Sequence, residues 1–151
     1  MKVEIVTPRG LAVSTDADEV TAPGVRGEFG VLPGHTPFIA ALKPGVLSFR
    51  KGGKREVLAV GAGFAEVSGK DRVVVLTQQA ADTREADAKR ELGVQAIDAA
   101  QAQRDLEEAE RALKDGKFGT GDNGGGPTRE EWEARRAWAQ ARLDARSAAR
   151  S

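Results

Sequence analysis

Few residues of this chain are of the types that carry out covalent or metal chemistry. The 151-residue sequence contains one histidine, His35, and no cysteine. Without cysteine there are no disulfides, thiolate metal sites or cysteine nucleophiles, and zinc sites usually need several histidine or cysteine ligands. A serine–histidine–aspartate triad would have to run through His35. We therefore expect no catalytic residue and no metal site, and interpret the chain as one that acts by binding partners.

One glycine pattern resembles a nucleotide-binding sequence. Gly119 to Gly124 reads G-x-G-x-x-G. In dinucleotide-binding folds this pattern follows a strand and opens a helix. Here it follows an expected helix, and Pro127 and the capping residue Thr128 come after it. We interpret the stretch as part of a linker.

Charge and hydropathy exclude further classes of protein. Basic and acidic residues each number 23, so the formal net charge is zero. This balance lacks the electrostatic footprint of a nucleic-acid-binding protein, so we expect no nucleic-acid partner. No apolar run approaches the roughly 18 residues of a membrane span, so we expect no direct membrane insertion. Glu4 interrupts the apolar stretch that a signal peptide requires, which argues against export.

Residues 1–81 have the pattern of short strands separated by turns. Gly52-Gly53 joins two apolar-rich stretches in the manner of a two-residue β-hairpin. Ser68 to Asp71 joins residues 64–67 to residues 73–76 in the same way. Strands that repeat every 8–12 residues or so are typical of an antiparallel sandwich or barrel, because parallel pairs need long crossovers. We predict an antiparallel β-sandwich over residues 1–81.

From residue 82 the pattern becomes helical. Asp82 or Thr83 can cap a helix, and Asp82 with Glu85 has the spacing of a capping box. Six glycines then interrupt the pattern between Lys114 and Pro127, and Thr128 with Glu131 gives a second capping box. We predict a two-helix hairpin over residues 82–151 with a glycine-rich linker at 115–127. The fold class is thus α+β, an N-terminal antiparallel β-sandwich followed by a C-terminal α-helical hairpin.

The apolar stripe of the first predicted helix is built mainly from small side chains. Apolar residues recur every seven positions, with alanines between them, at Leu92, Ala96, Ala99, Ala102, Leu106, Ala109 and Leu113. Alanine buries little area, and burial stabilises by only about 25 cal/mol per Å². We expect the hairpin to be marginally stable alone and able to open, as a regulatory element would.

Two segments are candidates for partner binding. Glu28 to Pro37 contains two prolines and two glycines, and is either a structural turn or a docking loop held by a rigid scaffold. Ala134 to Ser151 carries five arginines against one aspartate, and is either a solvated helix end or a surface for an acidic protein.

Of Trp132 and Trp138, we expect one to pack in the hairpin and the other to be free to anchor a partner. The candidate partner-binding residues are Glu28, Gly30, Pro33, Gly34, His35, Arg135, Arg136, Arg142 and Arg146.

Several stretches of the sequence are similar to the sequence patterns of one protein family. The stretch Gly27 to Pro37, G-E-F-G-V-L-P-G-H-T-P, with Lys43-Pro44-Gly45 downstream, is similar to a G-E-x-G-[IV]-x-P-G-H-x-P stretch of that family. Residues 61–67 and 73–77 resemble the family's G-G-F-x-E-V and V-T-V-L strands. The chain thus resembles the epsilon subunit of bacterial F-type ATP synthases, and the resemblance extends over nearly the whole chain.

The resemblance implies a non-catalytic subunit on the central stalk of a proton-translocating rotor. Such a subunit binds gamma and the c-subunit ring, couples them to the catalytic alpha and beta subunits, and uses its C-terminal helices to inhibit ATP hydrolysis. It would lie peripherally on the cytoplasmic face of the bacterial inner membrane. By position, Glu28 and His35 fall in the loop that faces the c ring and gamma. A free adaptor that uses the hairpin as a tether is another interpretation, and an independent enzyme is the least favoured.

Some members of the family bind ATP through an [IL]-D-x-x-R-A sequence. The matching residues here are 86–91, where Asp87 and Arg90 are in place. Ala86 replaces the bulky aliphatic residue, and Glu91 places a negative charge near a phosphate site. The stretch is therefore either a helix surface or a regulatory ATP site, and in the second case the chain would be a nucleotide-sensing module. We expect no permanent cofactor.

Overall fold

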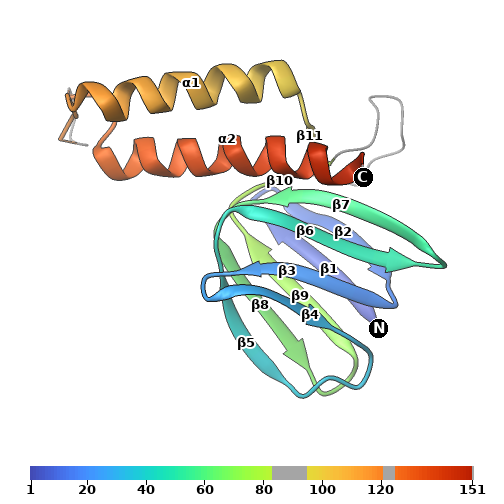
Figure 1. Cartoon of the computed structure of the whole chain (residues 1–151). Helices are drawn as coiled ribbons and strands as arrows, with labels where there is room; N and C mark the ends of the chain where they lie inside the picture. Colours follow the sequence, from blue (N-terminus) through green and yellow to red (C-terminus); the bar gives the residue numbers. More distant parts are fainter. Residues whose placement is uncertain (83–94, 121–124, 151) are drawn as a thin grey trace.

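The chain folds into a β-sandwich with a helical hairpin lying across one side of it (Figure 1). This computed structural model describes residues 1–82, 95–120 and 125–150. The described residues form two helices, α1 (Ala99–Asp115) and α2 (Arg129–Ala149), and eleven strands. The strands are β1 (Lys2–Thr7), β2 (Gly10–Asp16), β3 (Glu19–Gly24), β4 (Gly27–Val31), β5 (Phe38–Leu42), β6 (Gly45–Lys51), β7 (Lys54–Val60), β8 (Gly63–Ser68), β9 (Arg72–Thr77), β10 (Ala80–Asp82) and β11 (Gln95–Ala96). The predicted fold class is confirmed.

The described strands form one continuous eleven-stranded sheet that folds into two layers, which we call its two sheets and which meet at a narrow junction. One sheet runs β11-β10-β7-β6-β3, with β4 paired to β3, and the other runs β5-β8-β9-β1-β2. Between β3 and β5 the described pairing consists of one residue pair, Gly24 and Leu42. The two sheets face each other and enclose the core, whose largest fully buried side chains include Ile5, Leu47 and Val75.

The predicted turns are present, but one strand pair differs from the expected antiparallel pattern. Gly52 and Gly53 connect β6 to β7 with φ angles of 56° and 80°, which explains why two glycines are needed there. Strand β1 pairs with β9 in parallel, whereas its pairing with β2 is antiparallel. The first and ninth strands are separated by nearly the whole sandwich, and this chain length supplies the crossover that a parallel pair requires.

The first helix in the described residues is α1, which covers only part of the stretch predicted to be helical. Asp82 ends strand β10, which pairs with β7, and α1 begins only at Ala99. The N-cap is Asp98, whose side chain accepts a hydrogen bond from the Gln101 amide. Gln95–Ala96 form strand β11, which pairs with β10, so the predicted helix is wrong at Ala96. Thr83 and Glu85 of the predicted helix start lie outside the described residues. Leu92, the first residue of the predicted stripe, lies outside the described residues.

The second helix begins and ends as predicted. Thr128 and Glu131 form the capping box reciprocally: the Thr128 amide donates to the Glu131 carboxylate, and the Glu131 amide donates to the Thr128 hydroxyl. The helix ends at Ala149. Of the helices in the described part of the chain, none has the length and apolarity to cross a membrane.

The hairpin packs on the sandwich through a second, smaller apolar cluster. Ala141 and Ala145 of α2 lie against Val57 and Ala59 of β7, with Trp138 at the margin. The seam between the helices is made of small residues as predicted, with Ala102, Ala109 and Ala139 fully buried. Because α2 lies against β6 and β7, it covers the outer face of one sheet.

Candidate functional site: surfaces for partner docking

The segment from Glu28 to Pro37 divides into a strand and a loop. We predicted one continuous shaped loop, but Gly27 to Val31 form strand β4, in which Glu28 pairs with Pro23 and Gly30 with Thr21. The loop itself is Leu32 to Pro37, which we call the tip loop. Both prolines of the segment lie in the tip loop, so β4 loses no backbone hydrogen-bond donor and pairs normally with β3.

The tip loop is exposed along its whole length and is braced from two sides. Within the loop, the His35 amide donates to the Leu32 carbonyl at 3.1 Å. From the β8–β9 turn, the Asp71 carboxylate accepts a hydrogen bond from the Gly34 amide at 2.7 Å. The His35 ring lies 4.9 Å from the Phe38 ring at the start of β5. Pro33, Gly34 and His35 are therefore presented on a shaped surface, as a docking loop requires.

Glu28 lies on a different surface from His35. It lines a shallow polar groove of about 220 Å³ on the outer face of β3, β4, β6 and β7, to which His35 does not contribute. Arg50 and Arg55 also line this groove, and Arg50 forms an ion pair with Glu19 at 3.7 Å. The two residues that we grouped as one docking site thus belong to neighbouring surfaces.

An exposed apolar row crosses the outer face of the second sheet, and we did not single it out from the sequence. The strand registers place its members opposite one another in successive strands: Ala41, Phe64, Leu76, Val6 and Leu11. Phe64, Leu76 and Leu11 remain 56%, 53% and 45% exposed. We call these five residues the apolar row. The alternation of apolar and polar residues within each strand could have indicated which side chains face outward. Only the register between strands shows that these five residues are aligned.

The four candidate arginines of α2 separate into two inward and two outward side chains. Arg142 donates to the Asp105 carboxylate of α1 at 2.7 Å and is only 14% exposed. Arg146 donates to the carbonyl of Ile97 at 3.3 Å, and its Nε atom is buried without a hydrogen-bond partner. Arg135 and Arg136 are exposed. In this arrangement only Arg135 and Arg136 are available to a partner.

The two tryptophans also have different surroundings. Trp138 packs against the second apolar cluster, with the Arg142 guanidinium 5.5 Å from its ring centroid. Trp132 is half-buried near the start of α2, under the Arg135 guanidinium at 4.8 Å. Trp138 therefore contributes to docking of the hairpin on the sandwich, and Trp132 lies beside the outward arginines.

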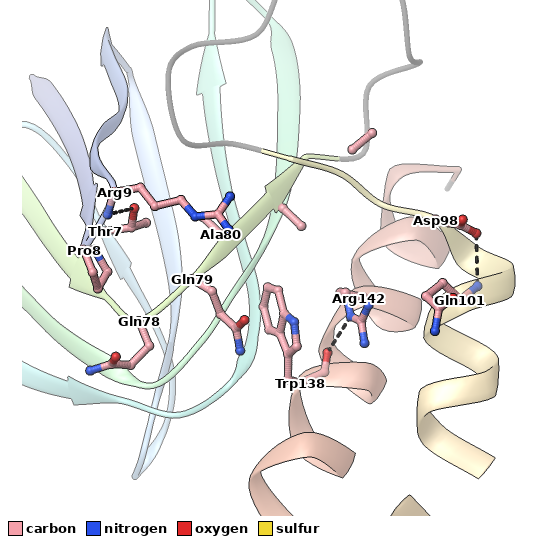
Figure 2. A pocket seen from close by; sticks show the side chains of 12 residues that line it. Thr7, Pro8, Arg9, Gln78, Gln79, Ala80, Asp98, Gln101, Trp138 and Arg142 are labelled. Carbon is pink, nitrogen blue, oxygen red and sulfur yellow. Dashed lines mark hydrogen bonds between the residues drawn. The ribbon is translucent and has the colours of Figure 1, made fainter. Parts of the chain in front are cut away.

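A pocket of about 370 Å³ lies where the hairpin meets the sandwich (Figure 2). Arg9, Gln78 and Gln79 reach it from the sandwich, and Asp98, Gln101, Trp138 and Arg142 reach it from the hairpin. Its lining mixes polar and apolar side chains, and its charged residues are Arg9, Arg142 and Asp98. The candidate ATP contacts Asp87 and Arg90 lie outside the described residues.

Two carboxyl groups have lowered pKa values because arginines bind them. Arg72 donates to both carboxylate oxygens of Glu4, at 3.0 and 2.9 Å, and this hydrogen bonding lowers the pKa of Glu4. Burial raises the pKa of Asp105, but hydrogen bonds from Arg142 and Gln101 outweigh it, so the net pKa lies below the ordinary value of 3.8. Asp105 is thus held as an anion at neutral pH and keeps Arg142 paired.

Comparison with known proteins assigns the chain to a family. Residues 1–83 match the family model described as ATP synthase, Delta/Epsilon chain, beta-sandwich domain. The chain is 47% identical over 90 residues to an ATP synthase epsilon chain of Geotalea uraniireducens, covering 60% of this chain but only 64% of that relative. It is 44% identical over 114 residues to the epsilon chain of Myxococcus xanthus, covering 76% of this chain and 75% of the relative.

A solved structure has the same fold. It is a chain of the Euglena gracilis mitochondrial ATP synthase, determined as an OSCP/F1/c-ring assembly, with a TM-score of 0.68, 23% identity, and coverage of 92% of this chain and 76% of that chain. At this identity the likeness concerns the fold alone. The family match and the two relatives carry the assignment: the chain belongs to the ATP synthase delta/epsilon family, and its relatives are epsilon chains, non-catalytic subunits of that complex.

Proposed function

We propose that this chain is a central-stalk rotor subunit of a proton-translocating F-type ATP synthase. In this role the sandwich binds the gamma subunit and the c-subunit ring, and so couples proton-driven rotation to the catalytic alpha and beta subunits. The subunit would lie peripherally on the cytoplasmic face of the bacterial inner membrane, without inserting into it. The apolar row is the observation that carries this proposal.

The apolar row supports a protein partner on the sheet that the hairpin leaves open. A contiguous patch of exposed apolar side chains commonly marks a surface that a partner protein covers. A single exposed apolar side chain is normal on a protein surface and needs no such explanation. Here Phe64, Leu76 and Leu11 adjoin one another through the register of four strands. Since α2 covers β6 and β7, this row is on the outer face of the other sheet. We assign it to gamma and assign the tip loop to the polar loops of the c ring.

The proposal predicts that charge in the apolar row prevents gamma binding. The double substitution Phe64→Glu and Leu76→Glu places two carboxylates where an interface would bury them. We expect the full-length variant to bind purified gamma at least about 30-fold more weakly, the loss typical of one strong interface residue. The measurement is titration calorimetry with the native chain and the variant.

A matched control distinguishes the row from any exposed apolar residue. Leu32, in the tip loop, is 58% exposed, which is close to the 56% exposure of Phe64, but lies outside the row and on the surface that we assign to the c ring. Leu32→Glu should bind purified gamma within about threefold of the native chain, as expected for a surface residue away from the gamma interface. Equal binding by both variants would contradict the assignment, and so would an absence of native binding at micromolar concentration.

We further propose that the hairpin inhibits ATP hydrolysis by contacting the alpha and beta subunits. The two outward arginines, Arg135 and Arg136, support an acidic surface on the partner, and such rim charges mainly accelerate and orient docking. The apolar cluster between the hairpin and the sandwich is also rich in small residues, with Ala141 and Ala145 of α2 against Ala59 of β7, and this supports a hairpin that can leave the sandwich. Inhibition would then depend on how often the hairpin opens.

The junction pocket favours a second candidate function, nucleotide sensing. A phosphate-bearing ligand such as ATP could contact Arg9 and Gln101 there and hold the hairpin closed. Against this, the Arg142 guanidinium is already neutralised by Asp105, and Asp98 adds a further negative charge. We therefore rank sensing below the rotor role, with which it is compatible.

A further inference from the structure

The tip loop is held by one long-range hydrogen bond, and the residue that makes it has an unusual backbone. Asp71 has a φ angle of 52°, the only positive value among the non-glycine residues that the structure describes. Such a conformation is uncommon for residues other than glycine, and aspartate and asparagine are among those that tolerate it best. It orients the Asp71 carboxylate back across the turn toward the Gly34 amide, 2.7 Å away and 37 residues earlier in the chain.

Further contacts join the same turn to its neighbours. The Asp71 carbonyl accepts a hydrogen bond from the Lys2 amide at 2.8 Å, which fixes the turn to the start of β1. On the loop side, Gly34 has a φ angle of 82°, so its amide is presented by a conformation that favours glycine. A methyl group at Gly69 would contact the Pro37 ring at 3.4 Å, which places the loop end close to the turn. Figure 1 shows the β4–β5 loop and the β8–β9 turn together at the end of the sandwich far from the hairpin.

We propose that Asp71 is a positioning residue of the docking surface. Its bond to the Gly34 amide holds the tip loop in one conformation before the c ring arrives, so that binding does not have to order the loop. The inference rests on the proposed function, because it assumes that the tip loop docks on the c ring. Ordering a loop costs binding energy, and a pre-organised loop avoids this cost.

The test uses two substitutions that separate the hydrogen bond from the backbone conformation. Asp71→Gly keeps the positive φ angle without strain and removes the acceptor. Asp71→Asn tolerates the same φ angle and keeps an acceptor oxygen. We expect the full-length Asp71→Gly variant to bind a detergent-solubilised c-ring–gamma complex about fivefold to tenfold more weakly, the net value of one ordinary hydrogen bond, and Asp71→Asn to stay within about twofold.

A matched control comes from a similar bond at another turn. The Asp18 carboxylate accepts a hydrogen bond from the Gly52 amide at 3.1 Å, and so joins the β2–β3 and β6–β7 turns. Asp18→Ala removes this bond without touching the tip loop, and should lower the melting temperature while leaving the affinity unchanged. Amide hydrogen exchange in the isolated chain should show faster exchange at Gly34 in Asp71→Gly only.

The outcomes separate failure of this inference from failure of the rotor assignment. If the native chain binds the complex and Asp71→Gly binds equally well, Asp71 has no positioning role while the proposed function stands. If Asp71→Gly and Asp18→Ala weaken binding equally, the effect is one of general stability and the inference is overturned. If the native chain itself does not bind, the proposed function fails, and the docking role of Asp71 fails with it.

Discussion

Arg142 shows how one side chain can be directed inward by several weak contacts. Its guanidinium binds the Asp105 carboxylate, lies over Trp138, and contacts the Trp138 carbonyl at 3.5 Å, the last of which Figure 2 marks. Arginine suits this position because its planar fork can bind a carboxylate and stack on an aromatic ring together. Its charge is therefore largely neutralised beside the junction pocket.

This pairing leads to a prediction for ATP at the residue scale. Because Arg142 is paired and the sequence places Glu91 where the ATP-binding pattern has alanine, we expect no ATP binding at concentrations below about 1 mM, an affinity weaker than about −4 kcal/mol. Isothermal titration calorimetry of the full-length chain measures this directly. Asp105→Asn, which removes the competing charge, should bind ATP more tightly than the native chain if the pocket is an anion site at all. Saturable micromolar binding by the native chain would contradict the prediction.

The hairpin is closed by an apolar seam of small residues together with a few polar contacts. Because Ala102, Ala109 and Ala139 bury little apolar area, each polar contact is a large part of the free energy that holds the two helices together. One contact carries a cost, because the buried Nε atom of Arg146 has no hydrogen-bond partner, and such atoms destabilise the state that buries them. Opening the hairpin would return this atom to water. The closed hairpin thus combines favourable and unfavourable polar terms.

A pH dependence follows for the hairpin element. The folded-state pKa of Asp105 is lowered, so its stabilisation is present above the unfolded pKa of about 3.9 and is lost as the pH falls through the lower folded value. Asp105→Asn cannot titrate and should lose less stability between pH 5 and pH 3. We expect a difference of about 1 kcal/mol, because the 32% exposure of Asp105 leaves the pair partly screened. Urea unfolding in a Trp132→Phe background, followed through Trp138 fluorescence, measures the hairpin interface.

The control for this prediction is Asp144→Asn. Asp144 accepts a hydrogen bond from Gln140 at 2.8 Å, as Asp105 does from Gln101 at 2.7 Å, but no arginine in the described residues is recorded in an ion pair with it. Its substitution should leave the acid dependence of the native chain unchanged. If the stability of Asp105→Asn and of Asp144→Asn fell equally with pH, the ion pair between Asp105 and Arg142 would contribute nothing to the acid dependence of the hairpin.

At the scale of the whole molecule, the hairpin and the proposed docking surfaces lie on different sides of the sandwich. Helix α2 covers β6 and β7, whereas the apolar row crosses the outer face of the other sheet. The tip loop lies at the end of the sandwich far from the helices (Figure 1). The hairpin can therefore move without disturbing the surfaces that we assign to gamma and the c ring.

This separation predicts independent effects on coupling and inhibition. Deleting residues 84–151 from the assembled complex should raise its ATP hydrolysis rate while ATP-driven proton pumping continues, because the sandwich remains bound. The measurements are steady-state hydrolysis and proton pumping in membrane vesicles. Unchanged hydrolysis would refute the inhibitory role, and loss of pumping would refute the independence of the two surfaces.

A charge-matched pair of variants locates the inhibitory surface within the hairpin. Arg135→Ala with Arg136→Ala removes the two outward arginines of α2, and Arg104→Ala with Arg111→Ala removes two exposed arginines of α1. If α2 contacts an acidic partner, only the α2 pair should raise hydrolysis toward the rate of the truncated complex. Equal effects of both pairs would indicate a dependence on net charge alone.

Local sequence signals determined most of the secondary structure and the family. The Gly52-Gly53 turn, the Thr128–Glu131 capping box and the alternating strands act between residues only a few positions apart. Because these interactions are complete within a short segment, neighbouring residue types are enough to identify them. The absence of cysteine and the single histidine likewise follow from composition alone.

Tertiary structure decided which surfaces are available, because that depends on residues far apart in the chain. The Gly34–Asp71 and Asp105–Arg142 contacts each span 37 positions, and neither has a local pattern that reveals it. The register of successive strands assembled the apolar row, and pairing of β11 with β10 placed a strand at Ala96, where the local pattern predicted a helix. An apolar or charged side chain is available to a partner only if no other part of its own chain packs against it. Which side chains are covered in this way depends on the folded structure.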